Sequence, residues 1–179
     1  SLDKVCEKMI FRHPHVFGDV QVSGADEVLK NWDSIKKETK HQETASDTLE
    51  GVCKALPALM YAQKLGKRAG RAGMDWKNAE DAFQYIRKET DELEEAMQSG
   101  DSERISEELG DLLFSCVNTA RHLHVDAETA MRDAAEKFLS RFKETERLVL
   151  ADKKEMASLG LDTLDEYWAK AKENLAKPE

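Results

Sequence analysis

The stretch IRKETDELEEAMQSGDSERISEELGDLLFSC, residues 86–116, decides the interpretation of the whole sequence. It holds two segments with apolar residues at helical spacing, separated by Ser-Gly-Asp at positions 99–101. Glycine favours the left-handed backbone that ends a helix, and aspartate favours the position that begins one. We therefore predict helices over about 77–98 and 102–123. A connection this short places the two helices side by side and antiparallel.

Each of these predicted helices carries two acids three residues apart: Glu89 and Glu92, then Glu108 and Asp111. At about 100° per residue, Glu89 and Glu92 lie about 60° and 120° from the apolar residue Ile86. The second pair has the same two offsets, about 60° and 120°, from its own apolar stripe. Both pairs thus occupy one flank of the core-facing side, and the antiparallel turn predicts that all four acids converge between the helices.

Four converging carboxylates repel one another unless a cation lies among them. Oxygen-only ligands select Mg²⁺ or Mn²⁺ over zinc, so the pattern predicts a site for a hard divalent cation. The alternative for any single acid is an ordinary solvated position on a helix surface. We assign four other acids of this stretch to that class: Glu94, Glu95, Glu103 and Glu107.

The remainder of the chain is also predicted to be helical. Only 9 Gly and 3 Pro occur in 179 residues, and we find no convincing strand. Further helices are expected over residues 2–11, 26–40, 56–69, 126–150 and 163–175, with a linker at 41–50. The residues expected to face the core are Ala82, Phe83, Ile86, Leu93, Ala96 and Met97, then Ile105, Leu109, Leu112, Cys116, Ala120 and Leu123, then Ala127, Met131, Ala134, Phe138 and Phe142.

Composition restricts the partners and the compartment. The net charge of −9 argues against nucleic acid as the main partner. The three cysteines are far apart and form no metal or redox motif, which favours a reducing, cytoplasmic location. Because no apolar run could span a bilayer, we expect no membrane partner.

Several motifs together resemble the MazG nucleoside triphosphate pyrophosphohydrolases. They are Glu89-Thr-Asp-Glu92, Glu108-Leu-Gly-Asp111, Asn118-Thr-Ala-Arg121-His122, Glu136-Lys137-Phe138-x-x-Arg141-Phe142 and Gly73-Met74-Asp75-Trp76. The resemblance implies an all-α helical bundle with a four-helix core and a homodimer. It also implies Mg²⁺-dependent attack on the α-phosphorus of a nucleoside triphosphate, releasing the monophosphate and pyrophosphate.

By the same resemblance, the four acids hold the metal, and we prefer Glu92 as the one that orients the attacking water. The implied substrate-binding residues are Arg104, Lys137, Arg141 and Trp168. The alternative for the three cations is ordinary surface charge, and for the tryptophan it is packing of the last helix. Two positions depart from the family pattern, because Lys88 stands where a glutamate is common and Ala135 where an asparagine often occurs.

The front of the chain shows a weak internal repeat. Glu7-Lys8-Met9-x-x-Arg12 matches the segment at 136–141, and the sequence at 12–17, RHPHVF, is similar to the end of the first domain in two-domain MazG proteins. We therefore expect residues 1–50 to be the tail of a first MazG-like copy plus a linker. Residues 51–179 are expected to form the catalytic domain, as the C-terminal half of a two-domain member.

Two other functions stay open at this stage. A di-metal carboxylate oxidase would need two Glu-x-x-His pairs on core helices, and the chain has one such pair, Glu38 and His41, in a lysine-rich stretch. The second alternative is a non-catalytic helical dimerisation or regulatory module that retains the acids. The departures at Lys88 and Ala135 favour it.

Overall fold

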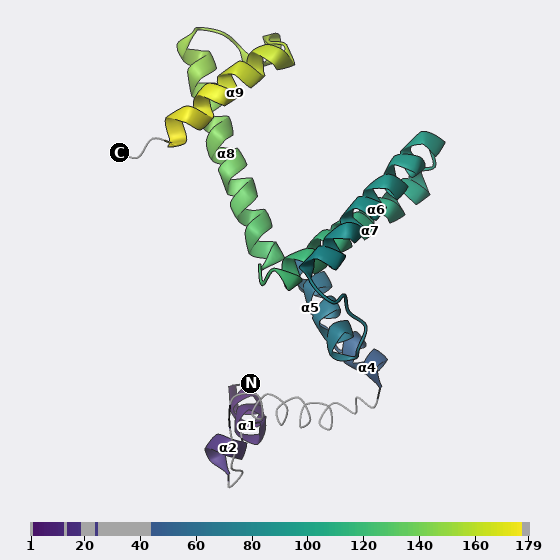
Figure 1. Cartoon of the computed structure of the whole chain (residues 1–179). Helices are drawn as coiled ribbons and strands as arrows, with labels where there is room; N and C mark the ends of the chain where they lie inside the picture. The colour runs from purple at the N-terminus through teal and green to yellow at the C-terminus, as the bar shows by residue number, and fades with distance from the viewer. Residues whose placement is uncertain (1, 13, 19–23, 25–43, 177–179) are drawn as a thin grey trace. The chain divides into compact units, whose positions relative to one another are not determined.

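The fold is all-α, as predicted. The computed structural model describes residues 2–12, 14–18, 24 and 44–176, and no strand occurs among them (Figure 1). The elements are α1 (Leu2–Arg12), α2 (Pro14–Phe17), α4 (Ala45–Glu50), α5 (Ala58–Arg71), α6 (Ala79–Ser99), α7 (Ser102–His122), α8 (Ala127–Ala151), the 3-10 turn η1 (Met156–Ser158) and α9 (Leu161–Ala176). The chain divides into two units, residues 1–119 and 120–179, and each is described by itself.

In the first unit, the turn between α6 and α7 has the chemistry expected of it. The side chain of Asn78 begins α6 by accepting a hydrogen bond from the Asp81 amide at 2.8 Å. Gly100 ends α6 in the left-handed conformation, with φ of 71°. Asp101 then begins α7 by accepting a hydrogen bond from the Glu103 amide at 3.0 Å. These local preferences fix the hairpin that carries the acids.

The predicted linker at 41–50 is wrong in its second half, because Ala45–Glu50 forms the short helix α4. Thr44 and Asp47 make a reciprocal capping box, in which each side chain accepts a hydrogen bond from the other residue's amide. That capping box supplies partners for two amides that would otherwise lack them, so a polar segment becomes helical. The helix predicted over 26–40 lies outside the described residues.

The second unit is a hairpin of α8 and α9 held by a buried tyrosine. Tyr167 is 5% exposed, and its hydroxyl donates a hydrogen bond of 2.5 Å to Asp152. Lys154 donates to the same hydroxyl at 3.1 Å, so the tyrosine is anchored to the end of α8. Farther along, the Asn174 amide on α9 donates to the Glu144 carboxylate on α8 at 2.7 Å. Polar contacts at two points therefore fix α9 against the C-terminal part of α8.

The prediction of which apolar residues are buried is only partly correct. Ala82 and Ala96 of α6 are almost completely buried, at 1% and 0% exposed. The larger side chains of the same stripes stay exposed, because the apolar faces are wider than the contacts these helices make. They are Phe83, Met97, Leu109, Leu123, Met131, Phe138 and Phe142. None of the helices in the described ranges is both long and apolar enough to cross a membrane.

Candidate metal centre

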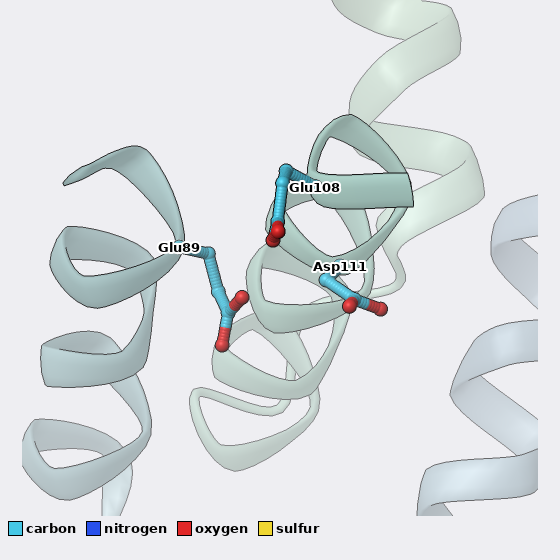
Figure 2. Close-up of side chains that lie close together, drawn as sticks. All are labelled: Glu89, Glu108 and Asp111. Carbon is cyan, nitrogen blue, oxygen red and sulfur yellow. The ribbon is translucent and has the colours of Figure 1, made fainter. Parts of the chain in front are cut away.

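The α6–α7 hairpin brings three of the four predicted acids together. Glu89 reaches from α6 toward α7, which carries Glu108 and Asp111 one turn apart (Figure 2). One carboxylate oxygen from each of the three residues lies within 4.8 Å of the other two. The i,i+3 spacing places the α7 acids on one flank, and the turn at Gly100 aims that flank at α6. The cluster therefore follows directly from the spacing seen in the sequence.

Burial differs sharply among the three carboxylates. Glu89 is 9% exposed, the side chain of Glu108 is 16% exposed, and Asp111 is open to solvent. Burial raises the pKa of Glu89 above the ordinary value for a glutamate, against the opposing effect of the Lys88 charge. The negative charges of Glu92 and Asp111 raise the pKa of Glu89 further. The ionised cluster is thus costly by itself, and a bound cation would relieve that cost.

Glu92, the fourth predicted acid, lies at the edge of the cluster and is paired with a lysine. The Lys88 ammonium is 2.9 Å from one Glu92 carboxylate oxygen and 3.8 Å from Glu89. The hydrogen bond from Lys88 lowers the pKa of Glu92. Glu92 is absent from the set of described acids whose oxygens converge within 4.8 Å. The structure therefore places Glu92 beside the cluster, with a different electrostatic environment from that of Glu89.

Arg104 lies on the first turn of α7, next to the same cluster. Its guanidinium is 3.7 Å from Glu108 and 3.5 Å from Glu95 of α6. Both separations are long and the arginine side chain is 42% exposed, so these ion pairs are weak and exchangeable. Arg104, which is predicted to contact phosphate, thus lies near the acids without a close ion pair to either of them.

The other predicted substrate residues belong to the second unit. Lys137 and Arg141 flank Phe138 on α8, and the Phe138 ring lies 5.2 Å from the ring of Trp168 on α9. Trp168 therefore packs α9 against the α8 segment that carries the two cations. This contact is the packing alternative given above for the tryptophan. It also gathers Lys137, Arg141 and Trp168 in one part of the hairpin.

Two features of the first unit were missed from the sequence. The Lys88–Glu92 ion pair has i,i+4 spacing, a standard signal of a helix-surface interaction that could have been read directly. Trp76, in the loop before α6, lies edge-on to Tyr85 with ring centroids 5.2 Å apart. No spacing rule pairs a loop tryptophan with a helix tyrosine, and the contact fixes this loop to α6 one turn before Glu89.

The donor set of the cluster fits a hard divalent cation. All three converging side chains offer carboxylate oxygens, and no histidine or cysteine belongs to the set. Such donors suit Mg²⁺ or Mn²⁺, whereas zinc sites use nitrogen and sulfur. The pronounced burial of Glu89 beside two other acids adds to the argument, because a neutralising ion would remove the repulsion that its surroundings impose.

Comparison with known proteins gives a consistent result. Residues 77–145 match the MazG nucleotide pyrophosphohydrolase domain, and this range contains the whole cluster. The chain is 42% identical over 170 residues to the nucleoside triphosphate pyrophosphohydrolase of Escherichia coli (strain K12), covering 94% of this chain and 65% of that protein.

It is also 42% identical over 166 residues to the nucleoside triphosphate pyrophosphohydrolase/pyrophosphatase MazG of Thermotoga maritima, covering 93% of this chain and 62% of the relative. A third similar protein, YabN of Bacillus subtilis (strain 168), is 38% identical over 170 residues, which is 94% of this chain and 35% of the relative. The chain thus spans slightly less than two thirds of the length of the first two relatives.

Proposed function

We propose that this chain hydrolyses nucleoside triphosphates to the monophosphate and pyrophosphate, because residues 77–145 match the MazG nucleotide pyrophosphohydrolase domain. Two relatives that are 42% identical carry the name nucleoside triphosphate pyrophosphohydrolase. The observation that carries the proposal is the three-carboxylate cluster of α6 and α7, which lies inside the matched range.

In this proposal Glu89, Glu108 and Asp111 hold Mg²⁺, for which Mn²⁺ can substitute. These residues would hold the ion where it could neutralise negative charge on the triphosphate oxygens, including the charge that develops around the phosphorus under attack. This assignment also answers how a chain with a net charge of −9 binds an anionic substrate. Glu92, the fourth predicted ligand, is hydrogen-bonded to Glu89 at the edge of the cluster. We propose that it completes the metal-binding set and also orients the attacking water.

The proposed reaction has a simple atomic balance. A water molecule gives its proton to a carboxylate while its oxygen attacks the α-phosphorus, and Glu92 is our choice for that carboxylate. The bond from the α-phosphorus to the bridging oxygen breaks, and that oxygen leaves with pyrophosphate. Arg104 is assigned to the phosphates because its guanidinium is held loosely near the cluster. Lys137, Arg141 and Trp168 are assigned to further phosphate and base contacts.

We propose in addition that the chain is a homodimer that works in the cytoplasm. Apolar side chains of α6, α7 and α8 stay more than 40% exposed, among them Phe83, Leu109 and Phe138. Exposed apolar surface of this extent is typical of association faces. The described cysteines Cys6, Cys53 and Cys116 are free thiols, which suits a reducing compartment.

The test of this function is the identity of the products. We would incubate the chain with Mg²⁺ and each common nucleoside triphosphate, and resolve the products by ³¹P NMR. Monophosphate and pyrophosphate should appear together in equal amounts. Orthophosphate and diphosphate as the primary products would contradict the assigned bond.

A matched pair of variants tests the site. Glu108→Gln should remove most of the turnover, because it takes one charge from the cluster. Glu103→Gln, an exposed acid on the same helix, should leave turnover unchanged. If every variant and the parent are inactive while Mn²⁺ still binds, the regulatory-module alternative replaces the enzyme assignment.

A further inference from the structure

Lys88 places a positive charge at the edge of the acidic cluster, on α6. Its ammonium is 2.9 Å from a Glu92 carboxylate oxygen, at i,i+4 spacing, and 3.8 Å from Glu89. Arg104 on α7 stands in the same i,i+4 relation to Glu108. Each helix of the hairpin therefore supplies a solvent-accessible cation one turn before an acid of the site, and the role proposed for Arg104 raises the question of what Lys88 does.

We propose that Lys88 is a further phosphate contact of the substrate, and that its ammonium leaves Glu92 for the triphosphate when the acids hold a divalent ion. Arg104 keeps the role assigned above, on the other helix. This inference rests on the proposed function, because it needs a triphosphate bound at the α6–α7 cluster. It concerns a position at which the chain departs from the glutamate common in the MazG family.

The ion pair of Lys88 with Glu92 is of a kind that exchanges easily. Exposed i,i+4 pairs contribute little to stability, and the Lys88 side chain is 57% exposed. In the proposed function Glu92 belongs to the metal-binding set, so its oxygens serve the ion as well as the lysine. An ammonium and a divalent ion that share one carboxylate repel each other at close range. The flexible four-carbon stem of the lysine lets the ammonium turn away from the acids without any change in the backbone.

The charge of the site gives the released ammonium a partner. The carboxylates of the proposed metal-binding set outnumber the charges of one divalent ion; they are Glu89, Glu92, Glu108 and Asp111. The negative charge left over would repel a triphosphate, which is itself an anion. A cation on each helix offsets that repulsion. Phosphate oxygens are strong acceptors for an ammonium, which can donate three hydrogen bonds.

The test is nucleotide binding by the full chain, measured by calorimetry with saturating Mg²⁺. The probes are the α,β-methylene analogues of ATP and CTP, one purine and one pyrimidine, in which the bond assigned above cannot break. Lys88→Met should weaken the Kd of the analogue that the parent binds more tightly by about five- to twentyfold, because a charge-assisted hydrogen bond is lost. Lys88→Arg keeps the charge and should bind within about threefold of the parent.

Mn²⁺ binding without nucleotide, followed by electron paramagnetic resonance, separates this role from an indirect one through the metal. Lys88→Met should leave the Mn²⁺ Kd unchanged or tighten it, since a positive charge beside the ion is removed. Arg87→Met is the matched control, because the Arg87 guanidinium lies over the Phe83 ring and donates to Gln84. It should leave both dissociation constants within about twofold of the parent. Urea unfolding verifies the fold of each protein, and Lys88→Gln provides a second uncharged variant should the methionine lower solubility.

Equal affinity of Lys88→Met and the parent for the analogue would overturn the inference and leave the proposed function intact. A loss of Mn²⁺ affinity as large as the loss of analogue affinity would also overturn it, since Lys88 would then act through the metal site. A parent that binds an analogue but releases no pyrophosphate from ATP or CTP would reject the proposed hydrolysis, and the affinities of the Lys88 variants would still decide the phosphate contact. Failure of the parent to bind either analogue with Mg²⁺ present would reject both proposals.

Discussion

Replacement of the buried acid should make the metal-free protein more stable. Glu89→Gln removes one of three carboxylates whose oxygens lie within 4.8 Å of one another. At 4.8 Å, two unit charges repel by about 3.5 kcal/mol at an effective dielectric constant of about 20, and by about 0.9 kcal/mol in water. Because Glu89 is nearly buried but Asp111 is exposed, we expect a gain of about 1–2 kcal/mol in the free energy of unfolding near pH 8.

The stability gained by Glu89→Gln should depend on pH in a definite direction. The folded state raises the pKa of Glu89, chiefly through burial, so the folded chain holds that proton more tightly than the unfolded chain does. The corresponding stability is fully present below the ordinary pKa of a glutamate and is lost as the pH rises through the folded pKa. Glutamine does not titrate. The advantage of the variant should therefore grow as the pH rises above the ordinary glutamate value and vanish below it.

Urea unfolding with a chelator present, repeated from about pH 4 to about pH 8, measures the effect. Saturating Mg²⁺ should stabilise the parent more than the variant, because the variant has lost a ligand. The difference in the free energy of unfolding between variant and parent should therefore shrink or change sign. Glu94→Gln, an exposed acid on the same helix, is the control and should shift stability by less than about 0.5 kcal/mol. A variant that is equal to or less stable than the parent near pH 8 without metal would refute the electrostatic account of the cluster.

Four more outcomes follow from the same structure. Asp111→Asn should remove most of the hydrolysis, measured by pyrophosphate release, and should leave the metal-free protein as stable as the parent or more stable. Activity within a few-fold of the parent would mean that the site lies elsewhere. Glu144→Gln should lower stability near neutral pH, because the pKa of Glu144 is lowered to about 2 in the folded chain. The corresponding stability is present above the ordinary glutamate pKa and is lost as the pH falls through the folded value; equal urea midpoints at pH 7 would contradict it. Tyr167→Phe should cost about 1 kcal/mol in urea unfolding by removing a buried hydrogen-bonded hydroxyl, and an unchanged midpoint would argue against that bond. A chain that starts near Ala25, and so lacks residues 1–17 together with the few that follow, should keep nearly the same turnover per chain, because no proposed site residue lies there. Loss of turnover in a folded chain of unchanged oligomeric state would place the front segment in the site.

The acidic cluster was predictable because it depends on local rules. Two i,i+3 acid pairs and a Ser-Gly-Asp turn fix which flank of each helix the carboxylates occupy, and Gly100 and Asp101 behave as helix-end chemistry requires. The helix at Ala45–Glu50 was missed because a capping box outweighs a polar composition. Burial was predicted less well, since a helical wheel shows which face is apolar but not how much of that face finds a partner.

The different surroundings of the four acids could not be predicted from these local rules. A helical wheel places Glu89 about 60° and Glu92 about 120° from the apolar stripe, but it does not show their neighbours. In the structure Glu89 loses most of its contact with water, and Glu92 gains a lysine one turn away. The two environments shift the pKa values of these glutamates in opposite directions, up for Glu89 and down for Glu92. Two carboxylates that differ in this way differ in how readily each holds a proton, and a bound cation would relieve most strain at the one whose surroundings oppose its charge. The environment of each acid therefore depends on neighbours that the spacing of the acids does not reveal, and Lys88, 2.9 Å from Glu92, is one of them.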